Sequence, residues 1–179
     1  MKLTWFGGTA IRIHAGGRIL VADPEAAPAT VDRVELLSGA DATLVLSGDT
    51  DDLPRLDVAS WRPRRARRVL DEGEPQARAE AFRIGPGALL VDADAEAPLL
   101  LLCGALPEFG RWADGAVAVL FGDGEALTRA GLALLAAARP KMLCVAGPDA
   151  AIEAALPALR GALGEAGLMA LSPGLAVEA

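Results

Sequence analysis

The sequence predicts an α/β protein in which two β-sheets pack face to face between helix layers, a compact four-layer αββα sandwich. Short apolar segments separated by glycine-rich turns open each half of the chain, and alanine- and leucine-rich helical segments follow. The chain has 179 residues, enough for one domain with a substantial core. We expect a single domain over 1–179 with weakly repeated halves, about 1–78 and 79–179.

The first half is predicted to open with three strands joined by tight glycine turns: Leu3–Phe6, Ala10–His14 and Arg18–Ala22. Residues 25–40 are polar and contain proline, so an irregular connection is expected. The apolar run Ala42–Leu46 is typical of a buried strand. Pro54–Trp61 is expected to form a short helix, Arg64–Leu70 a connection or strand, and Glu72–Gln76 a loop.

The second half repeats the strand-rich opening and then becomes helical. Its predicted strands are Ala79–Ile84, Ala88–Asp92, Leu99–Cys103, Ala116–Phe121, Met142–Val145, Gly167–Leu171 and Leu175–Val177. A helix is expected over Glu125–Ala138, where leucines recur in an alanine-rich frame that Pro140 ends. A second helix is expected over Ala150–Gly164.

Composition narrows the classes of function. The chain carries 24 acidic and 17 basic side chains, a net charge of −7, which argues against general nucleic-acid binding. No apolar run reaches the roughly 18–20 residues of a membrane span. Met1–Trp5 runs directly into a strand pattern, without the pattern of a signal peptide. We expect a cytoplasmic protein whose partner is a small molecule or a protein, with homo-oligomers left open.

The segment Leu44–Leu53 leads from an apolar strand into an acidic turn. Asp49, Asp51 and Asp52 crowd this turn. Carboxylate oxygens suit Mg²⁺, Mn²⁺ or Ca²⁺, but the same side chains also solvate a loop or cap a helix. Both interpretations remain open. The chain has one histidine, His14, and it lies elsewhere.

The opening Met1–Pro24 resembles that of the metallo-β-lactamase superfamily, closest to the small hydrolases related to the L-ascorbate-6-phosphate lactonases. The resemblance continues through Ala42–Asp52, Leu99–Phe109 and Val117–Gly147. In that family, the strand matching Leu44–Ser47 leads into a His-x-His-x-Asp-His motif that holds one or two zinc-like ions. Such ions lower the pKa of bound water, which then attacks at neutral pH.

The resemblance also implies where the metal ligands would lie. The corresponding positions are Gly8, Gly48, Thr50, Asp52, Leu53, Ala105 and Gly147. Only Asp52 among them carries a metal-ligating side chain, and the family's Asp-Pro pair is present as Asp23-Pro24. Zinc normally needs three or more protein ligands, so we expect no zinc and no other cofactor. The remnant pocket would comprise Asp52, Asp23, Thr50 and Asp49.

Other reactive side chains have structural interpretations beside the functional ones. Asp23 belongs either to the remnant pocket or to its own turn, where it would bond backbone amides. His14 has no partner ligands in sequence, which favours a surface or hydrogen-bonded role. Cys103 and Cys144 lie in apolar runs without a nearby base, so we expect unreactive, buried thiols.

Two further segments are candidates for anion binding. Arginines are concentrated in the run Arg62–Arg68, which either binds an anionic partner or forms a solvated face neutralised by the acidic residues that follow. Gly122-Asp123-Gly124 precedes the main helix, and a helix start favours anions. It lacks the lysine of a phosphate-binding loop.

Three hypotheses follow. The first is a degenerate metallo-β-lactamase-fold protein that lacks the metal ligands and serves as a non-catalytic binding or structural module. The second is a hydrolase with an altered Mg²⁺ or Mn²⁺ site of oxygen ligands around Asp49, Asp51, Asp52 and Asp23. The third is an anion-binding protein that uses the Arg62–Arg68 patch.

Overall fold

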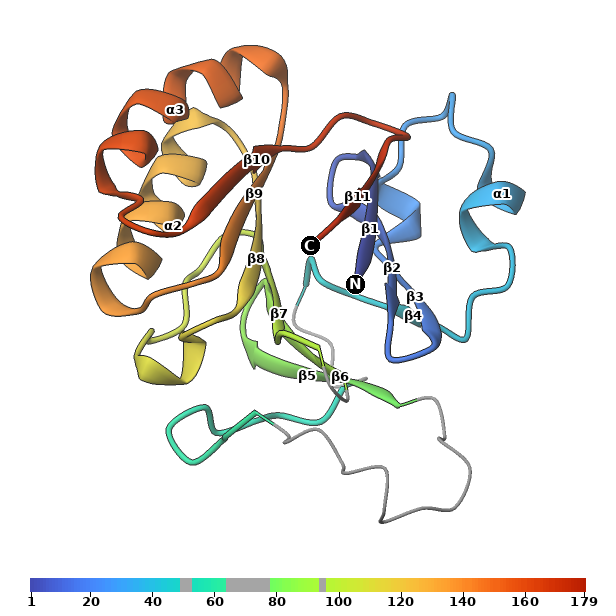
Figure 1. The fold of residues 1–179 in the computed structure, drawn as a ribbon. Coiled ribbons are helices and arrows are strands. Elements are labelled where there is room, and N and C mark those ends of the chain that lie inside the picture. The colour runs from blue at the N-terminus through green and yellow to red at the C-terminus, as the bar shows by residue number, and fades with distance from the viewer. Residues whose placement is uncertain (49–52, 64–77, 94–95) are drawn as a thin grey trace.

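Two mixed β-sheets form the frame of the protein (Figure 1). The computed structural model describes residues 1–48, 53–63, 78–93 and 96–179. The first sheet has the order β11-β1-β2-β3-β4, and only its β3–β4 pair is parallel. Its strands are β1 (Lys2–Gly7), β2 (Ala10–Ala15), β3 (Arg18–Ala22), β4 (Ala42–Leu44) and β11 (Ala176–Glu178).

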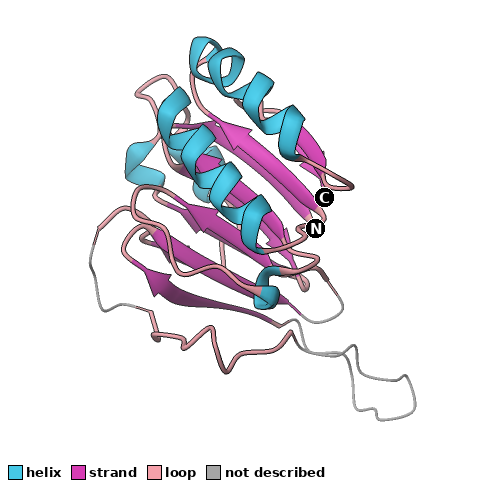
Figure 2. Cartoon of the chain, turned by 90° about the vertical axis from the view of Figure 1, so that its left-hand side faces the viewer, coloured by secondary structure: helices cyan, strands magenta, loops and turns pink. Residues whose placement is uncertain are grey.

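The second sheet has the order β10-β9-β8-β7-β6-β5, with parallel pairing from β7 to β10. Its strands are β5 (Ala79–Gly85), β6 (Ala88–Ala93), β7 (Leu99–Leu102), β8 (Val117–Phe121), β9 (Met142–Ala146) and β10 (Gly167–Ala170). Helices α2 (Gly124–Ala137) and α3 (Asp149–Ala162) connect β8 to β9 and β9 to β10. Figure 2 shows these two helices lying over the outer face of the sheet.

Three apolar clusters follow from this layering. The largest lies between the sheets, where side chains such as Ile11 and Ile13 of β2 meet Leu89, Leu101 and Val119 of the second sheet. A second cluster lies under α2 and α3. The third, over the outer face of the first sheet, is small and centres on Leu36. The described part of the chain is therefore covered much more heavily on one side than on the other.

Both sheets open with the same strand arrangement. Three antiparallel strands are followed by a fourth that pairs in parallel with the third, β1–β4 in one sheet and β5–β8 in the other. Each first hairpin has a register shift at the same place, just before Gly7 in β1 and just before Gly85 in β5. However, β11 at the end of the chain joins the first sheet, so the sheets are not two separate halves of the sequence.

Two connections differ from the sequence-based expectations. The segment 25–40 contains a 3-10 turn (Pro24–Ala26) and the helix α1 (Arg33–Leu37). Asp32 caps α1 by accepting hydrogen bonds from the amides of Val34 and Glu35. The helix expected over 54–61 is wrong, because tertiary pairing overrides the local preference: Pro54 and Leu56 hydrogen bond to the backbone of Arg83 on β5. A turn follows at 58–60.

Arg12 on the outer face of the first sheet anchors α1. Its guanidinium donates to the carbonyl oxygens of Leu36 at 2.8 Å and Ser38 at 2.6 Å, at the end of the helix. Its Nε donates to Nε2 of His14 at 3.1 Å, which requires a neutral imidazole. Burial and the positive charges of Arg12 and Lys2 lower the pKa of His14. His14 is thus the hydrogen-bonded residue that the sequence favoured.

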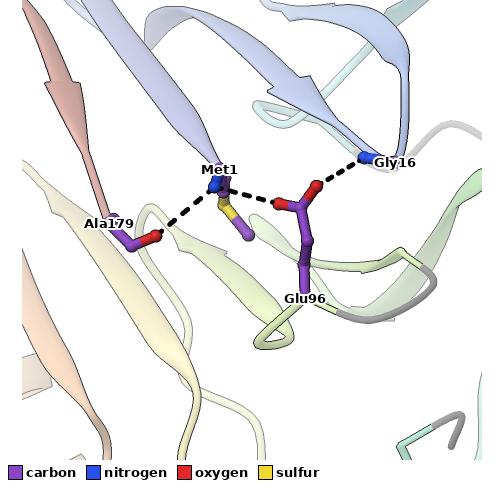
Figure 3. A network of polar contacts seen from close by, with 4 residues as sticks. All are labelled: Met1, Gly16, Glu96 and Ala179. Atoms are coloured by element: carbon purple, nitrogen blue, oxygen red, sulfur yellow. Dashed lines mark hydrogen bonds and ion pairs between the residues drawn. The ribbon is translucent and has the colours of Figure 1, made fainter. Parts of the chain in front are cut away.

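The two chain termini lie side by side at the first sheet, and Glu96 links them to the second sheet (Figures 1 and 3). Glu96, in the connection between β6 and β7, accepts a hydrogen bond from the amide of Gly16 at 2.8 Å and pairs with the Met1 ammonium at 3.1 Å. The same ammonium donates to the carbonyl of Ala179 at 3.5 Å. No helix among the described residues is long and apolar enough to cross a bilayer.

The lowered pKa of His14 predicts a pH-dependent stability. The unfolded chain takes up a proton near pH 6.5 and the folded chain only at lower pH, so the native state loses stability as the pH falls through this window. We expect the free energy of urea unfolding to decrease from pH 7.5 to 5.5, and to decrease less in His14→Gln. His14 is the only histidine, so an equal decrease in both proteins would contradict the assignment.

Candidate functional site

The candidate site lies at the edge of the sandwich where β3, β4 and β7 end. Asp23 directly follows β3, residues 45–48 follow β4, and Cys103 follows β7. The carboxyl ends of strands in such sheets are the usual place for binding and catalysis, because the loops that follow them converge there. The candidate site comprises these loops and the turn between β1 and β2.

Asp23 is the central polar residue of this edge. Its side chain is buried, with 6% of the residue exposed. One carboxylate oxygen accepts from the amide of Leu46 at 2.7 Å. The other accepts from the amide of Ser47 at 2.9 Å and from the hydroxyl of Thr9 at 2.6 Å. The carboxylate thus bonds backbone amides, but those of the segment after β4 rather than those of its own turn.

The backbone of Asp23 is also specialised. It adopts a left-handed conformation, φ 43° and ψ 53°, and is the only described non-glycine residue with a positive φ. Its amide donates to the carbonyl of Leu44 at 2.9 Å. Such a conformation is unfavourable for most residues, and aspartate tolerates it better than most. The hydrogen bonds of the carboxylate and amide hold it in place.

The two cysteines are poorly suited to nucleophilic chemistry. Burial raises the pKa of the Cys103 thiol, and the negative charge of Asp23 raises it further. Burial raises the pKa of Cys144 to about 11. Both thiols are therefore protonated at neutral pH, as the sequence led us to expect.

Arg83 was not identified from the sequence, yet it organises the segment after β4. It lies on β5 with 3% of its surface exposed. The guanidinium donates to the carbonyl of Val45 at 2.6 Å and of Gly48 at 3.3 Å. The backbone amide of Arg83 donates to the carbonyl oxygen of Pro54 at 2.9 Å. One signal in the sequence points to it: Arg83 lies two and four residues after Ala81 and Ala79, so it shares the strand face that these alanines turn toward the core between the sheets.

Two glycines at the expected ligand positions leave no room for a side chain. At Gly8, where φ is +54°, an added Cβ would lie 2.5 Å from the carbonyl oxygen of Ala26. At Gly147 it would lie 2.6 Å from the carbonyl oxygen of Gly122. In each case backbone occupies the space, so a longer side chain requires the main chain to move. Gly48 has φ +123°, which is also strained for other residues.

The helix start at Gly122-Asp123-Gly124 is already occupied by its own side chain. The carboxylate of Asp123 accepts from the amide of Ala126 at 2.9 Å and caps α2. An external anion would meet this negative charge. The structure therefore gives no support to the anion site considered there.

Several predicted site residues fall outside the described part of the chain. These are Asp49, Thr50, Asp51 and Asp52 of the acidic turn, and Arg64, Arg65, Arg67 and Arg68 of the arginine run. Asp23 and the neighbours of Gly8 and Gly48 are brought together, because Thr9, Leu46 and Ser47 all bond to Asp23. Gly147 lies against Gly122 instead.

The fold is similar to that of a metallo hydrolase. The solved structure that carries this likeness is Igni18, described as a novel metallo hydrolase from the hyperthermophilic archaeon Ignicoccus hospitalis KIN4/I. The match has a TM-score of 0.52 and 15% sequence identity, and it covers 98% of this chain and 97% of Igni18. No family model and no curated protein matches the chain. The likeness shows the fold: an α/β protein with two mixed sheets and few helices.

The described residues at this edge do not fit a zinc centre. Zinc needs three or more protein ligands. Within residues 1–48, 53–63, 78–93 and 96–179, no three His, Cys, Asp or Glu side chains gather closely enough to hold a metal ion. The oxygens of Asp23 already accept three hydrogen bonds from the protein. Backbone atoms fill the side-chain positions at Gly8 and Gly147.

Replacing Asp23 is predicted to destabilise the fold. Asp23→Ala leaves the amides of Leu46 and Ser47 without their acceptor, and bonds to a charged group contribute about 1.5–3 kcal/mol each. We expect a loss of about 3 kcal/mol or more in the free energy of urea unfolding. Asp41→Ala is the control, since Asp41 accepts one exposed amide bond from Ile19. Equal losses in the two variants would contradict the central role of Asp23.

Side chains at the glycine positions are predicted to destabilise the protein rather than restore a site. Gly8→Ala combines a left-handed backbone with a backbone clash, and we expect a loss of about 2–4 kcal/mol. Gly147→Ala introduces a backbone clash without a left-handed backbone, and we expect it to lower the free energy of unfolding by about 1–3 kcal/mol. Gly161→Ala on α3 meets nothing within 4 Å and should not destabilise. Thermal and urea unfolding measure all three, and wild-type stability of Gly8→Ala would refute the clash.

Proposed function

We propose that the chain is a degenerate member of the metallo-β-lactamase fold, a four-layer αββα sandwich in one domain. It binds no catalytic metal and serves as a binding or structural module. The observation that carries this proposal is that Asp23, the described member of the remnant pocket, is bonded to the protein itself. Asp23 bonds Thr9, Leu46 and Ser47, where a metal-binding carboxylate would keep an oxygen for the ion.

The geometry around the loop after β4 supports the same proposal. In a metal centre, a cation holds such a loop together through its ligands. Here the guanidinium of Arg83 binds two carbonyl oxygens of the loop, and Asp23 binds two of its amides. The hydrogen bonds of these two buried charged side chains thus hold the loop, as a bound cation would in a metal centre.

The alternative hydrolase with oxygen ligands requires the acidic turn. Asp49, Asp51 and Asp52 would supply its ligands together with Asp23, whose oxygens are engaged as described. We therefore propose the non-catalytic module as the function and treat the Mg²⁺ or Mn²⁺ hydrolase as the outcome that a metal titration would reveal.

Metal titration tests the proposal. A ligand present at 100 times its Kd stabilises a native protein by about 2.7 kcal/mol. We expect 1 mM Mg²⁺ or Mn²⁺ to leave the free energy of unfolding unchanged, and protein purified without chelator to contain far less than one zinc per chain. The control variant is the triple substitution Asp49→Asn, Asp51→Asn and Asp52→Asn. Stabilisation of the wild type but not of this variant would establish the oxygen-ligand site and overturn the proposal.

A further inference from the structure

Two adjoining hollows on the protein share the residues Arg111 and Asp114. One, of about 450 Å³, is lined by Ala59, Arg62, Pro63 and Trp112 together with the shared pair. The other, of about 490 Å³, is lined by the shared pair and by residues 135–139 at the end of α2. The 3-10 turn Arg111–Ala113 therefore forms a ridge between them. We call this surface the arginine ridge, defined by Arg62, Arg111 and Arg139.

The positive charges of the arginine ridge are only weakly compensated by carboxylates. Arg62 donates to the carbonyl oxygens of Ala59 at 3.2 Å and Trp61 at 2.6 Å, which orient the guanidinium but carry no net charge. The side chain of Arg111 is 96% exposed, and its Nε lies 3.8 Å from a carboxylate oxygen of Asp114. An exposed pair of this length contributes little.

Arg139 adds a third cation with a free head group. The backbone amide of Arg139 donates a hydrogen bond to the carboxylate of Asp114 at 2.8 Å. Within the described part of the chain, its guanidinium has no hydrogen bond or ion pair. Three guanidinium groups therefore surround the two hollows, and among the described residues that line them Asp114 is the one carboxylate. This surface is locally positive on a chain with a net charge of −7.

We infer that the arginine ridge is a docking surface for an acidic peptide segment of a partner protein. Guanidinium groups present paired N–H donors that match the two oxygens of a carboxylate. Two hollows separated by the Arg111 ridge suit alternate side chains of an extended peptide. The arginine run of the sequence begins at Arg62, at the rim of the first hollow.

A peptide is favoured over a nucleic acid for two physical reasons. The aromatic ring that lines the hollows is that of Trp112, which is 9% exposed and donates its Nε1–H to the carbonyl of Glu108. It offers no open face on which a base can stack. Furthermore, a long polyanion extends beyond the ridge of a chain whose net charge is −7, whereas a short peptide can remain on the ridge.

The inference rests on the proposed binding role but does not depend on the state of the metal site. The metal titration involves the acidic turn and Asp23, whereas the arginine ridge contains neither. Failure of peptide binding would therefore not contradict the proposal of a metal-free site. Discovery of a bound metal would not contradict the proposed docking surface.

Binding of a fluorescein-labelled octaglutamate peptide to the full chain tests the inference by fluorescence anisotropy. We expect binding at 50 mM salt that weakens at least tenfold at 300 mM salt, and at least tenfold weaker binding by the double variant Arg111→Gln, Arg139→Gln. The matched control is Arg33→Gln, Arg129→Gln, which removes the same charge from exposed arginines elsewhere. It should retain binding within twofold of the wild type.

Three outcomes would overturn the inference. One is absence of binding to octaglutamate at low salt. The second is an equal loss of binding in the two double variants, which would indicate a response to net charge alone. The third is tighter binding of a single-stranded thymidine oligonucleotide than of octaglutamate, which would assign the ridge to nucleic acid. Circular dichroism of each variant confirms that the substitutions at these exposed positions leave the fold intact.

Discussion

The hydrogen bonds of the buried Asp23 carboxylate are the constraint on which the site edge depends. Three segments meet at this group: the β1–β2 turn through Thr9, the end of β3 through Asp23 itself, and the chain after β4 through Leu46 and Ser47. A carboxylate in an apolar interior is stable only when its oxygens are bonded. The left-handed backbone at Asp23, the path of the chain after β4 and the closed surroundings of Gly8 form one mutually dependent arrangement.

A second buried charge holds the other side of the same loop. Arg83 binds the carbonyls of Val45 and Gly48, and its backbone pairs with Pro54 and Leu56. Amides are directed to an anion and carbonyls to a cation, so residues 45–48 are held from both directions. This explains how a fold similar to a metallo hydrolase keeps an ordered strand end without a cluster of metal ligands in its described residues.

The sequence predicts the strands well because apolar runs between glycine pairs leave few alternatives, as in β1 to β3 and β6 to β9. It does not predict α1 or the extended path at 54–56. Both depend on partners distant in sequence. Arg12 donates to a carbonyl oxygen at the end of α1, and the backbone of Arg83 pairs with Pro54 and Leu56. Asp23 was a candidate because of its Asp-Pro pair. Thr9 and Arg83 were missed, since neither a single threonine nor a single arginine in a strand indicates a buried bond.

The matched register shifts before Gly7 and Gly85 have a geometric consequence. Each lies in the first hairpin of a strand set with the same pairing, and in each set the third strand ends at the site edge, followed by Asp23 in one and Cys103 in the other. An irregularity of this kind bends a strand and increases its local twist, so the two facing sheets are shaped in the same way at the hairpin that opens each of them.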